Sequence, residues 1–212
     1  MQAFVDACQG GPAHARLEPT LHAIVHNPAL HARFLNSLSR LEYVGVRKML
    51  KTRRSQELDL DGLQHMLEEA AHATRLKKFA CAVAPAGVSV ATFSAEHTLA
   101  GDEAERYFQA VDRAGEHALG AGNPEASYAL TSAAIEIRAR TFYPAYQQVL
   151  QSSGQRVSVA SILSDEEAHL REMQARLQAL PDWQERLQHV MQVEERAFAS
   201  LLDALDQAIA SA

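Results

Sequence analysis

The chain has 212 residues, a formal net charge of −6 and 47% hydrophobic residues, which is enough to bury a core. Only 7 Pro and 10 Gly interrupt a composition dominated by Ala, Leu, Gln, Glu and Arg, and these residues favour an all-α protein. Basic residues are scattered apart from a cluster at 47–54, so nucleic acid is not an expected partner.

The cysteines and the apolar segments indicate where the chain resides. Cys8 and Cys81 have no neighbouring Cys or His at zinc-site spacing and cannot form a disulfide framework, which favours a reducing compartment. The N-terminal segment has no apolar stretch of signal-peptide length, and the weakly polar run at 79–93 is too short to span a bilayer. We therefore expect a cytoplasmic protein without a membrane partner.

Two long helices are predicted in the first half of the chain. The first starts at Asn27-Pro28, an N-cap residue followed by a proline at the first helical position, and ends at about Lys51. The second opens at Asp59 or Asp61, and Pro85 ends it. Because the connection between them is short, these helices should form an antiparallel hairpin.

The second half of the chain is predicted to repeat this arrangement after a crossover at 84–123. The crossover has no helical period at first and then a short helix at 102–119. A third long helix starts at Asn123-Pro124 and a fourth covers about 159–180, which together give a second hairpin. A fifth helix at 183–209 is rich in apolar residues, so we expect it to dock onto the other helices or onto a second subunit.

Each predicted hairpin carries one Glu-x-x-His motif. Glu69-Ala-Ala-His72 lies in the second helix and Glu166-Glu-Ala-His169 in the fourth. Residues three apart lie on the same helix face, so each pair could bind one metal ion. One such motif is weak evidence, because Glu and His are common in this chain. The positions of the other acids decide whether the motif indicates a metal site.

A single glutamate marks the first helix of each hairpin. Glu42 is the only acid in residues 19–56 and falls on the apolar stripe, and Glu136 is the only acid in residues 126–164. A buried carboxylate is costly unless it is paired or bound to metal. Ion pairs with nearby basic residues are the alternative, although their spacing is unfavourable. These neighbours are Arg40, Arg47, Arg138 and Arg140.

The joint pattern resembles the ferritin-like di-iron carboxylate superfamily, in which two helices give one Glu each and two give Glu-x-x-His. Ferritins, bacterioferritins, rubrerythrins, aldehyde-deformylating oxygenase and the tRNA-modifying di-iron hydroxylase have similar layouts. The resemblance implies a single ferritin-like domain over 1–212, with a four-helix bundle at about 28–180, the crossover and the extra C-terminal helix. It implies six ligands to two iron ions, with manganese or a mixed Mn/Fe pair as alternatives. These are Glu42, Glu69, His72, Glu136, Glu166 and His169.

Within that resemblance, Glu42 and Glu136 would be terminal ligands, while Glu69 and Glu166 would bridge the ions. Ordinary surface roles are also open at this stage. Ser164 and Glu167 match a capping box, which would put Glu166 at a helix start. Glu69 could be a solvated acid, as part of a surface ion-pair group with Arg75 and Lys77. Similarly, His72 and His169 could be polar surface histidines.

Other polar residues receive weaker predictions. Tyr143, two turns from Glu136, is a weak candidate for a redox-active residue or for a hydrogen bond to a metal ligand. Glu194 and Glu195 are expected on a solvated face. Three histidines near the start of the first long helix are interpreted as surface or helix-end residues. They are His22, His26 and His31.

Three kinds of function fit these predictions. The first is an oxidoreductase that activates dioxygen or peroxide on a small, apolar organic substrate. The second is a ferroxidase or iron-handling protein without an organic substrate, and the third is a binding or structural bundle. Because Cys-x-x-Cys pairs are missing, any electron donor should be a separate protein. We also expect a homodimer.

Overall fold

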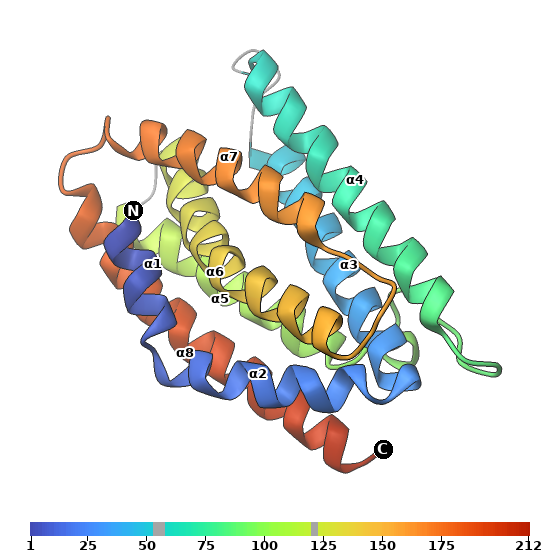
Figure 1. Ribbon diagram of the computed structural model, residues 1–212. Helices are drawn as coiled ribbons and strands as arrows, with labels where there is room; N and C mark the ends of the chain where they lie inside the picture. Colours follow the sequence, from blue (N-terminus) through green and yellow to red (C-terminus); the bar gives the residue numbers. More distant parts are fainter. Residues whose placement is uncertain (53–57, 120–122) are drawn as a thin grey trace.

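A computed structural model describes residues 1–52, 58–119 and 123–212, and within them every regular element is helical (Figure 1). The prediction of an all-α protein is therefore confirmed. The α-helices of these ranges are α1 (Gln2–Gln9), α2 (Pro12–Val25), α3 (Pro28–Thr52), α4 (Leu60–Val83), α5 (Gly101–Leu119), α6 (Pro124–Ser152), α7 (Ala160–Leu177) and α8 (Trp183–Ala210), with one 3₁₀ turn, η1 (Ala95–His97).

Helices α3 and α4 lie side by side and antiparallel (Figure 1). Asn27 caps α3 by accepting hydrogen bonds from the backbone N–H groups of Ala29 and Leu30. The side chain of Asp59 accepts from the N–H of Gly62 and caps α4 in the same way. Both helices thus begin where the sequence places their caps. The predicted turn between them falls at 53–57, outside the described residues.

Helices α6 and α7 form the second antiparallel pair (Figure 1). Asn123 accepts a hydrogen bond from the N–H of Ala126, and Pro124 occupies the first turn of α6. The predicted capping box at Ser164 is wrong, because α7 begins at Ala160. Glu166 therefore lies in the second turn of α7, where its side chain points toward α6 instead of capping the helix. The predicted end of the short crossover helix at 120–122 lies outside the described residues.

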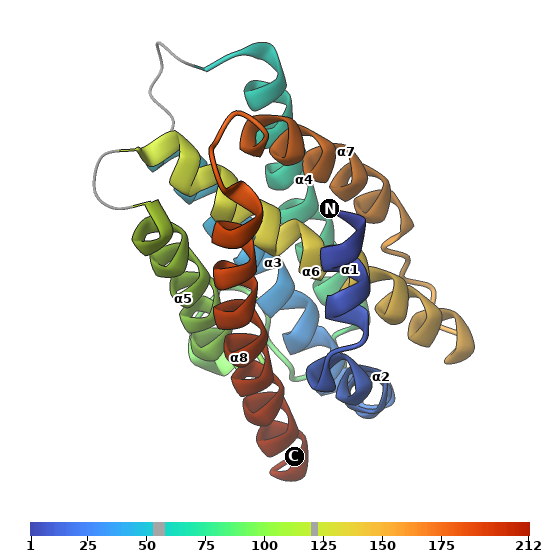
Figure 2. The ribbon, with the colours of Figure 1, turned by 90° about the vertical axis from the view of Figure 1, so that its left-hand side faces the viewer.

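The crossover passes over α3 and leads into α5. Asn36 of α3 donates hydrogen bonds to the carbonyl oxygens of Thr92 and His97, and Ser37 donates to that of Leu99. These bonds satisfy backbone groups of the segment at 84–100, whose regular structure is limited to the 3₁₀ turn η1. Helix α5 then packs against α6 and α8 (Figure 2).

The N-terminal region differs from the prediction. The sequence places the first helix at Asn27, but α1 and α2 precede it and pack against α6 and α8 (Figure 2). Their signal is weak because Gly10-Gly11 breaks the pattern and Pro19 lies inside α2. Of the three histidines in this region, His31 lies at a helix end, in the first turn of α3, but it is buried instead of exposed, and its Nε2 lies 2.7 Å from the Tyr146 hydroxyl.

Buried apolar side chains from all the α-helices of the described ranges form one connected cluster. The apolar face of α8 belongs to it through Leu187, Val190, Leu202 and Leu205, so this helix docks within the chain. Among the described residues, the longest helices are all too polar to cross a bilayer.

Candidate metal centre

The six predicted ligands come together between the two hairpins. Glu42 comes from α3 and Glu136 from α6, while α4 and α7 each contribute their Glu-x-x-His pair. Within the described residues, their atoms form two groups in which all ligand atoms lie within 4.8 Å of one another. Both groups are largely buried, and Glu69 belongs to each of them. These side chains are therefore positioned to bind metal.

The first group contains Glu42, Glu69, His72 and Glu166. Nδ1 of His72 lies 3.4 Å from Oε1 of Glu166 and 3.9 Å from Oε2 of Glu42. These distances are long for hydrogen bonds, yet they suit two atoms that bind the same ion at about 2.1 Å.

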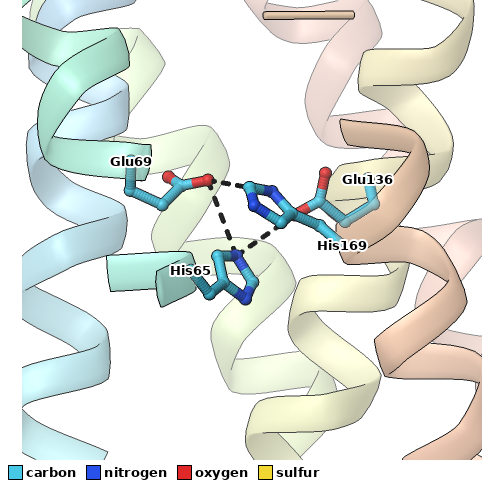
Figure 3. A group of neighbouring side chains, drawn as sticks. All are labelled: His65, Glu69, Glu136 and His169. Atoms are coloured by element: carbon cyan, nitrogen blue, oxygen red, sulfur yellow. Dashed lines mark ion pairs between the residues drawn. The ribbon is translucent and has the colours of Figure 1, made fainter. Parts of the chain in front are cut away.

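The second group contains Glu69, Glu136, His169 and one residue that the sequence analysis missed, His65 (Figure 3). Nδ1 of His169 lies 3.5 Å from Oε1 of Glu69 and 3.8 Å from Oε1 of Glu136. It also lies 3.6 Å from Oε2 of Glu166, whose other oxygen faces His72. Glu166 thus turns one oxygen toward each histidine, as a bridging carboxylate would.

Two acids next to the motifs fix the orientation of the motif histidines. Nε2 of His72 donates a hydrogen bond to Asp165 at 2.9 Å, and Nε2 of His169 donates to Glu68 at the same distance. In the neutral imidazole that each of these bonds favours, the lone pair is on Nδ1, which points toward the carboxylates. Neither Nδ1 atom has a hydrogen-bond partner, although both are buried. Such carboxylate–histidine pairs commonly orient metal ligands.

The electrostatics of the cluster favour bound cations. Burial, together with repulsion from Glu69 and Glu166, raises the pKa of Glu42 well above its usual value. Burial and Glu166 do the same to the pKa of Glu136. Burial alone would raise the pKa of Glu166, but a hydrogen bond with Glu136 and the nearby motif histidines lower it. Four carboxylates are thus crowded in one buried site, and two divalent ions would neutralise them.

Two neighbouring residues shape the carboxylate positions. Tyr143 donates a hydrogen bond to Oε1 of Glu42, which agrees with the predicted contact to a ligand. A Cβ atom added to Gly45 would lie 2.9 Å from Oε2 of Glu69, closer than such atoms approach in proteins. Gly45 therefore leaves room for Glu69 against the backbone of α3.

A cavity of about 130 Å³ adjoins the cluster, and all four carboxylates contribute to its wall. The rest of the wall is mainly apolar and comes mostly from α3, α5 and α6, with one residue each from α4 and α8. It includes Leu38, Leu41, Met49, Phe108, Ile135 and Phe142. The carboxylate–histidine cluster thus faces an apolar space large enough for a small molecule.

The basic residues considered as alternative partners make other contacts. Arg40 binds Asp102 and Glu105, Arg140 binds Glu167, and Lys77 donates to the Asn36 side chain. Glu69 is buried, so its alternative role as a solvated acid is wrong. His72 and His169 are buried as well, so their alternative role as surface histidines is also wrong. These three side chains are therefore surrounded by the other members of the carboxylate–histidine cluster and not by solvent.

The prediction that Glu194 and Glu195 form a solvated face is also wrong. Glu194 is fully buried and accepts two hydrogen bonds of 2.8 Å from Arg138 and one of 2.9 Å from the Tyr107 hydroxyl. Glu195 accepts a further hydrogen bond of 2.6 Å from Arg138. This buried network ties α8 to α5 and α6 next to the cavity, and Arg138 therefore does not pair with Glu136.

Fold and site together define an all-helical protein with buried carboxylate and histidine groups positioned to bind metal. A comparison of the chain with protein family models, with curated proteins and with solved structures finds no match. The assignment of a function consequently depends on the residues themselves. His65, the residue that was missed, had one available signal: it lies on the same face of α4 as Glu69 and His72.

Proposed function

We propose that the chain is a ferritin-like di-iron carboxylate protein that activates dioxygen or peroxide to oxidise a small, apolar organic substrate. In this proposal α3, α4, α6 and α7 are the four helices of the bundle, α5 belongs to the crossover, and α8 is an addition. The observation that carries it is the convergence of two Glu and two Glu-x-x-His motifs from these helices on one buried cluster.

The donor set fits two iron ions, and manganese in one or both positions would fit as well. Carboxylates and imidazoles suit both metals, and the unpartnered Nδ1 atoms of His72 and His169 point where an ion would bind. When bound, a pair of ferrous ions would supply the electrons that reduce dioxygen or peroxide. Glu42 and Glu136 would each hold one ion, while Glu69 and Glu166 would lie between the two.

The protein's own residues would prepare the site for this chemistry. With an ion bound, Asp165 and Glu68 would hold the motif histidines in the tautomer that has the proton on Nε2 and the lone pair on Nδ1. Tyr143 fixes Glu42 by donating a hydrogen bond to it. The apolar wall of the cavity would exclude water and hold the carbon skeleton of the substrate beside the carboxylates.

The cavity favours an organic substrate over iron alone. An engineered apolar cavity of about 150 Å³ binds benzene, and the volume beside the cluster is similar. Iron ions would need a polar path, whereas most of this wall is apolar. The separate electron donor and the homodimer remain predictions.

The proposal is tested with the reduced, iron-loaded protein, benzene as the probe, and the variant Ala139→Leu, which places a larger side chain in the cavity wall. We expect the wild type to bind benzene by isothermal calorimetry and the variant to lose binding while it oxidises ferrous iron normally. A wild type that oxidises iron repeatedly, stores the product and binds no apolar molecule would instead be a ferroxidase.

A further inference from the structure

We infer that His65 is a seventh metal ligand, on the side of Glu136 and His169, so that the two metal positions are chemically different. The inference rests on the proposed function, because it concerns the same pair of ions. It goes beyond the ferritin-like pattern, in which each motif supplies a single histidine.

The position of His65 in α4 gives the first argument. His65, Glu69 and His72 are spaced by four and three residues, so they share one face of the helix. His65 is only 3% exposed, in a helix whose opposite face is solvated. Its ring stacks on that of His169, with ring centres 3.7 Å apart. The side chain is therefore a full member of the buried cluster.

The nitrogen atoms of His65 give the second argument. Nε2 lies 3.6 Å from Oε1 of Glu69 and 3.8 Å from Oε1 of Glu136, and it points toward both (Figure 3). These separations exceed hydrogen-bond length, but two atoms bound to one ion at about 2.1 Å lie roughly 3–4 Å apart. The distances match those between Nδ1 of His169 and the same two oxygens.

A carboxylate behind His65 gives the third argument. Oε2 of Glu172 lies 3.4 Å from Nδ1 of His65, and Arg176 holds Glu172 through an ion pair of 2.7 Å. Each of the three histidines thus has one nitrogen toward the cluster and the other toward an acid. This acid is Asp165 for His72 and Glu68 for His169. A metal-binding imidazole commonly has such a partner.

The consequence is an unequal pair of positions. One would have Glu42 and His72, and the other Glu136, His169 and His65. Glu69 belongs to both groups, and Glu166 would be shared through its two oxygens. Additional imidazole ligation favours iron over manganese, whereas carboxylate ligation suits manganese. The position that includes His65 should accordingly be the more iron-selective of the two.

The first test is an anaerobic titration of the metal-free chain with Fe²⁺, followed by calorimetry. We expect two ions per wild-type chain, a loss of at least tenfold in affinity for one of them in His65→Ala, and weakening of the other in His72→Ala. The control His189→Ala removes an exposed histidine of α8 and should bind like the wild type. His65→Gln, which better fills the site, serves if the alanine variant does not fold.

The second test needs no variant of the cluster. With ¹⁵N-labelled histidine, titration of the wild type with Zn²⁺ should move the nitrogen resonances of three imidazoles into the metal-bound range. Two such imidazoles, or unchanged affinities in the His65 variant, would overturn the inference while leaving the proposed function intact. A wild type that binds no metal would overturn both. If the His65 variant is less stable without metal but binds Fe²⁺ normally, His65 acts only as an ion-pair residue, and this result would also contradict the inference.

Discussion

Nε2 of His169 donates a hydrogen bond to Glu68, the residue before Glu69 in the other motif. The reverse contact also exists, because His72 donates to Asp165, the residue before Glu166. Each Glu-x-x-His motif is therefore preceded by an acid that orients the histidine of the opposite motif. This reciprocal arrangement connects α4 and α7 across the site and makes each hairpin depend on the other for its ligand geometry.

Asp165→Asn should weaken metal binding without unfolding the chain. The variant replaces the charged acceptor that orients His72 by a neutral amide, and mutation of such a partner typically costs about 10–100-fold in metal affinity. Asp165 is partly exposed, so the stability of the metal-free protein should change little. Calorimetric titration with Fe²⁺ measures the effect. The neighbouring variant Glu167→Gln, which loses only a surface contact with Arg140, is the control. Equal affinities in both variants would argue against an orienting role for Asp165.

Gly45→Ala should weaken metal binding without lowering the stability of the metal-free protein. Alanine in a helix interior is favoured over glycine by about 0.5–1 kcal/mol. The new Cβ would however lie 2.9 Å from Oε2 of Glu69 and must displace that flexible side chain. We expect a metal-free protein at least as stable as the wild type, with metal affinity lowered severalfold. Thermal unfolding and a Co²⁺ titration report the two effects. Unchanged Co²⁺ affinity would show that Glu69 does not need this space.

Glu194→Ala should destabilise the fold strongly. Arg138 would remain buried with only Glu195 as a charged partner, and breaking a buried ion pair costs about 3 kcal/mol or more. Burial opposes the charge of Arg138, while Glu194 raises the pKa of its guanidinium. Urea unfolding measures the loss. Asp203→Ala removes an exposed partner of Arg16 and should cost at most about 1 kcal/mol. A loss in Glu194→Ala no larger than in this control would contradict the account of the network.

His31 should contribute to the loss of stability in acid. Burial lowers the pKa of His31 from 6.5 to about 4. Between these values the unfolded chain binds a proton that the folded chain excludes, so the free energy of unfolding decreases as the pH falls. This contribution of His31 to the free energy of unfolding is fully present above pH 6.5. It is lost as the pH falls to about 4, and the total loss is roughly 3 kcal/mol. Urea unfolding of the wild type and His31→Gln at pH 7 and pH 4.5 measures it. Identical pH dependence in both proteins would contradict a buried neutral His31.

The sequence could predict the long helices and the side chains that form the buried cluster because both leave local signals. Asn27, Asp59 and Asn123 begin helices by accepting backbone hydrogen bonds within a few residues. Glu42 and Glu136 interrupt apolar stripes, which marks a buried acid whatever its partner is. The regular spacing within each motif then indicates which side chains share a face.

The residues that escaped prediction have partners far along the chain. Glu194 follows an acid-rich helical pattern, and only the fold brings Arg138 and Tyr107 to it. The same holds for Glu68 and Asp165, whose histidine partners lie in the other hairpin. His65 has a local signal, but a search for Glu-x-x-His does not extend one turn before the motif.

The most direct test of the account is the metal content of protein expressed in iron-supplemented medium, with optical absorption recorded as oxygen is admitted. The account predicts about two iron ions per chain and an absorption band of an oxidised iron pair that Glu136→Ala loses. If neither iron nor manganese binds under loading conditions, the carboxylate–histidine cluster is not a metal centre and the proposed function is wrong.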